Sequence, residues 1–101
     1  MYKILITSSN LPNTLENIAH ALIKKRLSPC TQIIKDVKSF YLWDGEINSD
    51  NEQLLLIKCT LSNAQAVKEV IYNYHNYEVP EIISHEFEII SKKYKKWFNE
   101  N

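Results

Sequence analysis

Residues 39–47 constrain the fold more than any other part of the chain, because they place Asp44-Gly45 between two apolar runs. This pair predicts a two-residue hairpin turn, since both positions need positive φ, which Gly adopts freely and Asp tolerates. Residues 31–43 are rich in Ile, Val, Tyr and Phe, and residues 54–57 are Leu-Leu-Leu-Ile. The sequence therefore predicts one long hairpin, in which the polar residues 48–51 form either a bulge or a frayed tip.

The predicted hairpin is too long for a domain of this size. Its first arm of about 13 residues would measure roughly 43 Å at 3.3 Å per residue. A compact domain of this length has a radius of gyration near 13 Å, so it is only about 33 Å across. Phe40 and Leu42 would lie on one face of the overhang, with Tyr41 and Trp43 on the other. We therefore expect another copy of the same chain to cover it.

The remaining pattern predicts alternating strands and helices. Residues 2–8 form an apolar run typical of a buried strand, and residues 82–89 an edge strand. Two helices follow from apolar residues at helical spacing, the first capped by Asn10 or Asn13 and the second by a capping box of Ser62 and Gln65. Their apolar stripes are Leu15, Ile18, Ala19, Leu22 and Ile23, and Val67, Val70, Ile71 and Tyr74. Ser91 would cap a short terminal helix.

The order β-α-β-β-α-β-α predicts a single domain, residues 1–101, of the α+β class. Two right-handed crossovers joined by a hairpin give the ferredoxin-like βαββαβ sandwich, in which both helices pack on one face of the sheet. The other face is bare. A bare apolar sheet face on a small domain is a second reason to expect self-association.

Composition excludes several function classes. Twelve basic residues balance twelve acidic ones, which predicts no nucleic-acid partner and no electrostatic attraction to an anionic membrane. A single glycine excludes glycine-rich phosphate loops, and no apolar run is long enough to span a bilayer. Two distant cysteines make no disulfide framework. Because the first residues also lack a signal-peptide pattern, we expect a cytoplasmic protein.

The histidines and cysteines offer little for a metal ion. His20, His75 and His85 form no i, i+4 pair, and only His75, in a predicted loop beside tyrosines, is a candidate ligand for copper or zinc. We expect weak binding at most, and no resident cofactor. If the hairpin register continues from the turn without a bulge, Cys30 lies opposite Cys59; a bulge would abolish that pair. Inert buried thiols are the favoured interpretation.

No nucleophile–base pair or hydrolase signature is present, so we expect no enzyme. Polar and aromatic residues could instead line a cleft between subunits, in which Lys58, if buried, would need a glutamate partner. A structural ion-pair network would use the same residues, and both interpretations stay open. The expected cleft residues are Tyr41, Trp43, Glu52, Lys58, Tyr77, Pro80 and Glu81.

Several of these segments together resemble the CutA family of divalent-cation tolerance proteins. Residues 39–47 are similar to the family's serine–aromatic–tryptophan–glycine hairpin. Residues 52–58 are similar to its glutamate, apolar run and lysine, and residues 75–82 to its histidine–x–tyrosine–x–x–proline–glutamate segment. Cys30 after Ser28-Pro29 and the aromatic residues 94–97 also fit. The similarity runs in order from Tyr2 to Phe98.

The resemblance implies a ferredoxin-like homotrimer whose long hairpins reach across to neighbouring subunits. It also implies a non-enzymatic role in tolerance of divalent metals such as copper, with metal or a small ligand bound at inter-subunit clefts. Copper-binding relatives place a cysteine where this chain has Thr7, and two adjacent histidines where it has Tyr74-His75. The alternative is a trimeric small-molecule sensor of the PII-like kind, which shares this architecture and binds no metal.

Overall fold

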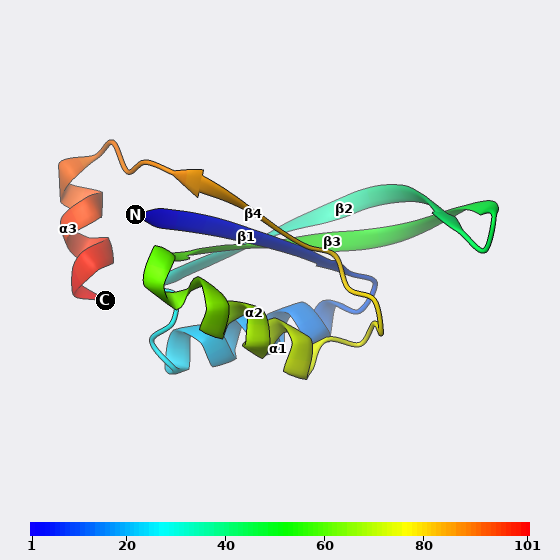
Figure 1. Cartoon of the computed structure of the whole chain (residues 1–101), viewed down its shortest axis with the longest axis horizontal. Coiled ribbons are helices and arrows are strands. Elements are labelled where there is room, and N and C mark those ends of the chain that lie inside the picture. The colour runs from blue at the N-terminus through cyan, green and yellow to red at the C-terminus, as the bar shows by residue number, and fades with distance from the viewer.

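Four antiparallel strands form one sheet, and two helices cover one of its faces (Figure 1). The computed structural model describes residues 1–101, with a longest dimension of 46 Å. The sheet order is β2-β3-β1-β4, which confirms the predicted βαββαβ topology and the edge position of the last strand. The elements are β1 (Tyr2–Ser9), α1 (Pro12–Lys24), β2 (Cys30–Trp43), β3 (Glu46–Thr60), the 3-10 turn η1 (Leu61–Asn63), α2 (Ala64–Tyr74), β4 (Ile82–Phe87) and α3 (Lys92–Glu100).

The core lies between the sheet and helices α1 and α2. Each helix buries the stripe that its 3.6-residue period places on one side. The central strands supply the opposite wall through alternate residues. The residues of this core are Leu15, Ile18 and Leu22 of α1, Val67, Val70 and Ile71 of α2, Leu5 of β1, and Leu55, Ile57 and Cys59 of β3. None of the helices is long and apolar enough to cross a membrane.

The hairpin turn is the one predicted. Asp44 has φ 51° and Gly45 has φ 76°, so both central residues adopt the left-handed region that this turn requires. Trp43 consequently pairs with Glu46. Strand β1 pairs with β3 only over residues 53–60, so residues 37–52 form a two-stranded projection beyond the rest of the sheet (Figure 1). The predicted overhang is confirmed.

A β-bulge at residues 35–36 corrects the predicted register of the cysteines. Ile34 pairs with Leu54, whereas Val37 pairs with Glu52. This one-residue shift places Cys30 opposite Lys58 instead of Cys59. The bulge lies in β2, not within residues 48–51, because Asp36 takes a left-handed conformation with φ 59° that its short polar side chain tolerates.

The thiol of Cys59 lies in the core instead. Burial raises its pKa to about 11, so the thiol stays protonated and unreactive at neutral pH. That outcome agrees with the inert interpretation of this cysteine.

Helix capping is only partly as predicted. Ser62 and Gln65 form no capping box, because the chain first makes η1 and the Ser62 hydroxyl lies 3.2 Å from that of Thr60. Helix α1 is preceded by Leu11, without a side-chain cap from either asparagine. Ser91 does cap α3, since its Oγ accepts a hydrogen bond from the Tyr94 N–H at 3.2 Å.

We expect Gly45→Ala to weaken the hairpin by about 1–2 kcal/mol, because an L side chain in the left-handed region is strained by that amount. A Cβ at Gly45 would have nothing within 4 Å, so the cost is conformational and not steric contact with neighbours. Faster amide hydrogen exchange over residues 38–51 would report it. Asp44→Asn is the matched control and should exchange as the wild type does, because Asn tolerates the same conformation. Unchanged exchange in Gly45→Ala would contradict the turn assignment.

Candidate functional site

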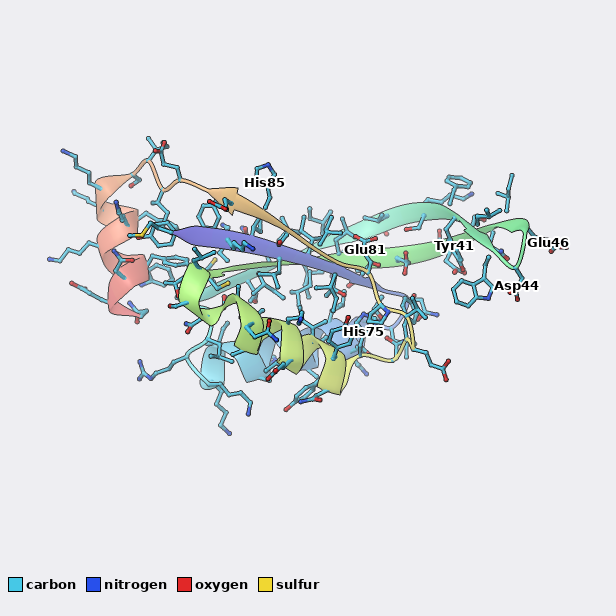
Figure 2. The ribbon with its side chains drawn as sticks, viewed as in Figure 1. Tyr41, Asp44, Glu46, His75, Glu81 and His85 are labelled. Atoms are coloured by element: carbon cyan, nitrogen blue, oxygen red, sulfur yellow. The ribbon has the colours of Figure 1, made fainter.

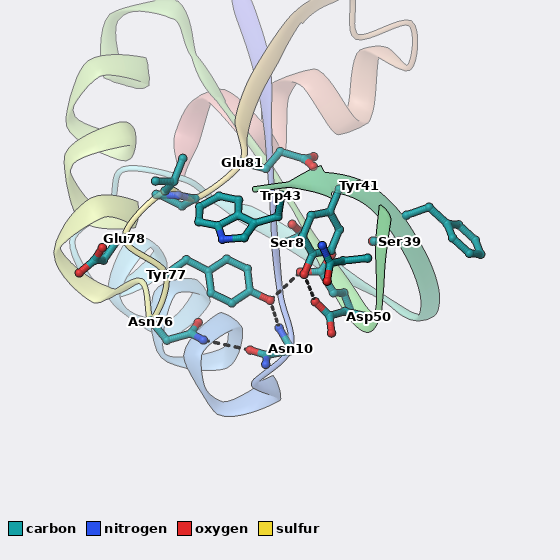
Figure 3. Close-up of a pocket in the computed structure, with 15 residues that line it drawn as sticks. Ser8, Asn10, Ser39, Tyr41, Trp43, Asp50, Asn76, Tyr77, Glu78 and Glu81 are labelled. Carbon is teal, nitrogen blue, oxygen red and sulfur yellow. Dashed lines mark hydrogen bonds between the residues drawn. The ribbon is translucent and has the colours of Figure 1, made fainter. Parts of the chain in front are cut away.

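A cleft of about 820 Å³ lies along the projecting hairpin (Figure 3). Three segments form its walls: the hairpin, the end of β1 and the loop between α2 and β4. The hairpin contributes Ser39, Phe40, Tyr41, Trp43, Asn48, Asp50 and Glu52. The end of β1 and the residue after it contribute Ser8 and Asn10, and the loop contributes residues 76–81.

The strand register explains why the hairpin presents polar and aromatic groups together. Tyr41 lies opposite Asn48, and Ser39 lies opposite Asp50; directly opposed residues point to the same face of a strand pair. Trp43 shares that face because it follows Tyr41 by two residues. The apolar residues fall on the opposite face, where Phe40, Leu42 and Ile47 are 68%, 71% and 84% exposed.

Tyr77 connects all three walls of the cleft. Its hydroxyl donates to Glu52 Oε2 at 2.7 Å and accepts from the Asn10 N–H at 2.8 Å. The Tyr41 hydroxyl likewise donates to Asp50. Burial, together with the bond to Glu52, raises the pKa of Tyr77, and the bond to Asp50 raises the pKa of Tyr41. Both phenols therefore remain neutral and hold the two carboxylates in place.

His75 holds the loop against β1. Its Nε2 lies 2.9 Å from the Ser8 carbonyl oxygen and 3.1 Å from Thr7 Oγ1, while Nδ1 lies 3.0 Å from the backbone N–H of Tyr77. A carbonyl can only accept a hydrogen bond and a backbone N–H can only donate one. Nε2 therefore carries the proton and Nδ1 does not, so the ring is neutral. Burial lowers the pKa of His75 accordingly.

The structure brings six of the seven expected cleft residues together within one chain: Tyr41, Trp43, Glu52, Tyr77, Pro80 and Glu81. Lys58 is not among them. It lies near the other end of β3, where its Nζ is 5.9 Å from the ring centroid of Tyr94. Figure 2 places His75 below the sheet and Glu81 near the base of the hairpin, while His85 lies farther along β4, toward α3. That the cleft is shared between subunits stays a prediction.

Sequence reasoning missed Asp50 and Asn10. Asp50 could have been found, because the register set by the turn places it opposite Ser39. Asn10 contributes a backbone N–H to Tyr77, and no side-chain pattern signals such a role. The loop residues Asn76 and Glu78 also line the cleft and were not expected.

The charges of the cleft have one sign. No Lys, Arg or His lines it. Four carboxylates do, those of Asp50, Glu52, Glu78 and Glu81. The carboxylates nevertheless do not converge, since no group of three or more His, Cys, Asp or Glu residues could hold a metal ion. The cleft is thus suited to attract cations without being a formed chelate site.

The fold and the cleft define a ferredoxin-like α+β domain with a projecting hairpin. A family model described as "CutA1 divalent ion tolerance protein" matches residues 3–101, and the chain belongs to this family. The divalent-cation tolerance protein CutA of Thermus thermophilus is 33% identical over 101 residues, covering 100% of this chain and 98% of that protein. The CutA homolog of Xenopus laevis is 37% identical over 82 residues, 81% of this chain but 54% of that protein. The chain thus spans about half of that longer relative.

Solved structures of CutA1 proteins have the same fold as this chain. The structure of Cut A1 from Thermus thermophilus has a TM-score of 0.93 at 33% identity, covering 100% of this chain and 98% of that chain. CutA1 from a psychrotrophic Shewanella has a TM-score of 0.92 at 29% identity, covering 98% of this chain and 92% of that chain. The predicted membership of the CutA family is confirmed.

The neutral state of His75 predicts a pH dependence of stability. Because the pKa of His75 is lower in the folded chain than its ordinary 6.5, the unfolded chain binds more protons just below that pH. The free energy of unfolding should therefore fall as pH drops through this window. Urea unfolding at stepped pH measures it, with His75→Gln, which cannot titrate, as the control. Parallel curves for the two proteins between about pH 7 and pH 5 would contradict the neutral assignment.

Proposed function

We propose that the protein acts in divalent-cation tolerance as a homotrimer that binds cations in the acidic cleft. Membership of the CutA family supports the general role. The observation that carries the molecular part is the lining of four carboxylates with no basic residue. Carboxylates grouped in a concave site raise the local concentration of cations. Oxygen ligands that do not converge would hold a divalent metal only weakly.

His75 is the residue we propose for any weak binding of copper or zinc. Binding at either nitrogen would displace a hydrogen bond, because Nε2 donates to Ser8 and Nδ1 accepts from Tyr77. The adjacent Thr7 hydroxyl, 3.1 Å from Nε2, stands where the resemblance places a cysteine. A hydroxyl is a poor ligand for a soft metal, whereas a thiolate is a good one.

Thr7→Cys should therefore tighten the binding of Cu²⁺, because a thiol would then adjoin the imidazole of His75. Calorimetric titration of the wild type and of Thr7→Cys would measure the difference. The gain should disappear in the double variant that adds His75→Ala. Submicromolar affinity that survives His75→Ala in the wild-type background would show that the metal binds elsewhere.

Two uncovered apolar surfaces support the homotrimer. One is the outer face of the hairpin, with Leu42 71% and Ile47 84% exposed. The other is the bare face of the sheet (Figure 1), to which strand alternation assigns Ile34 and Ile83, 47% and 54% exposed. Contiguous apolar surface of this kind marks protein–protein contact in soluble proteins. Neighbouring copies could cover both surfaces.

Leu42→Lys should reduce the assembly to a monomer, because a charge would have to be buried in the contact. Light scattering at micromolar concentration gives the mass directly. Ile23→Lys is a matched control, since Ile23 is 48% exposed on α1, away from both apolar surfaces. A wild-type mass of one chain, or a trimer that persists in Leu42→Lys, would contradict the proposed contact.

The second candidate function is that of a PII-like small-molecule sensor. The cleft volume of about 820 Å³ favours it, because pockets for small molecules measure about 300–1,000 Å³. A single metal ion needs far less room. Metal titration compared with a thermal-shift screen of metabolites would separate the two, since only the true ligand class should raise the melting temperature.

A further inference from the structure

The cleft has aromatic walls as well as negative charge. Tyr41, Trp43 and Tyr77 line it from the hairpin and the loop, and Figure 3 shows their rings grouped around the same opening. In the single chain Trp43 is 55% exposed and Tyr41 is 41% exposed, so the chain itself leaves part of each ring uncovered. The face of an aromatic ring attracts a cation, most strongly at tryptophan.

The carboxylates are placed to complement such a cation. Asp50 and Glu52 are each held by a tyrosine hydroxyl, and each carboxylate can accept further hydrogen bonds. An ammonium group presents donors only, so it matches acceptors of this kind. Anionic ligands would find no basic side chain among the lining residues.

A bare metal ion fits this arrangement less well. The groups that could coordinate it do not gather in threes, and the aromatic faces offer it no ligand atom. A cation–aromatic contact already occurs on the other face of the hairpin, where the Lys38 Nζ lies 5.6 Å from the ring centroid of Phe40.

We propose that the ligand of the cleft is an organic cation, a molecule that bears an ammonium group on an apolar body. The ammonium group binds between the faces of Tyr41 and Trp43 and the carboxylates of Asp50 and Glu52. The inference rests on the proposed cation-binding function of the cleft and names the chemical class of its ligand.

The test uses three probes at matched ionic strength: 1,4-diaminobutane, its neutral analogue 1,4-butanediol, and MgCl₂. Trp97→Phe, at the far end of the molecule on α3, leaves Trp43 as the only tryptophan. Its fluorescence, together with calorimetry, then reports on the cleft. We expect the diamine to bind saturably and to change the Trp43 emission, whereas the diol does not.

Two pairs of variants separate charge from aromatic contact. Asp50→Asn with Glu52→Gln should weaken diamine binding roughly tenfold or more, while Glu69→Gln with Glu100→Gln, on α2 and α3, should leave it unchanged. Tyr41→Leu should bind the diamine about fivefold more weakly than Tyr41→Phe, because both variants lose the hydroxyl that holds Asp50 but only Tyr41→Phe keeps the ring.

The outcomes distinguish this inference from the function on which it rests. Binding of Mg²⁺ in the cleft without binding of the diamine overturns the organic cation and leaves the cation cleft standing. Failure of both probes overturns both proposals. Equal binding of diol and diamine shows an apolar pocket and overturns the inference. Loss of affinity in the carboxylate variant but not in Tyr41→Leu overturns the aromatic contribution.

Discussion

The pairing of β2 with β3 is the interaction on which the rest of the structure depends. The turn at Asp44-Gly45 sets the register of the outer half, and the bulge at residues 35–36 resets it by one residue for the inner half. Because a one-residue shift exchanges the two faces of a strand, the inner half can place Ile33 opposite Leu55 on the core side. The outer half keeps Tyr41 and Trp43 on the face that forms the cleft. One strand pair thus serves a packed core at one end and an open cleft at the other.

A chain of hydrogen bonds fixes the opposite wall of the cleft. It runs from the Ser8 carbonyl through the His75 ring to the backbone of Tyr77, and from the Tyr77 hydroxyl to Glu52. Each of the neutral bonds contributes only about 0.5–1.5 kcal/mol net, and the bond to the Glu52 carboxylate about 1.5–3 kcal/mol. The wall is therefore held by polar contacts that a ligand could rearrange, whereas the sheet behind it is held by the apolar core. The separation lets the cleft adapt without disturbing the fold. It also explains why a neutral histidine, and not a charged one, suits position 75: a proton on Nδ1 would face the N–H of Tyr77.

Features set by neighbours in the sequence could be predicted, and features set by tertiary contacts could not. The turn, the overhang and both core helices follow from local patterns, and the strand register alone would have placed Asp50 beside Tyr41. Cys30 and Cys59 would be opposed only in a hairpin without a bulge, and nothing in the sequence marks Asp36 as left-handed within a strand. Lys58 was expected in a cleft between subunits because it ends an apolar strand; in the single chain it lies near Tyr94, and its place in an assembly stays a prediction. The backbone N–H of Asn10 became part of the site only because the chain bends there after β1.

The chain as a whole has zero net charge, but its positive and negative charges are distributed unevenly along the long axis of the molecule. Lysines 92, 93, 95 and 96 lie on α3, while the four carboxylates of the cleft lie toward the hairpin at the other end of a molecule 46 Å long (Figure 1). At physiological ionic strength the interaction of exposed charges decays over about 8 Å. The lysines of α3 therefore cannot neutralise the cleft, and the basic residue nearest to it is Lys38, which lies on the outer face of the hairpin over Phe40. A balanced composition offers no extended positive surface for an anionic partner such as nucleic acid, yet it is compatible with a local site for a small positive ligand. Aromatic rings beside those carboxylates supply what charge alone lacks, a preference for a weakly hydrated cation over a strongly hydrated metal ion.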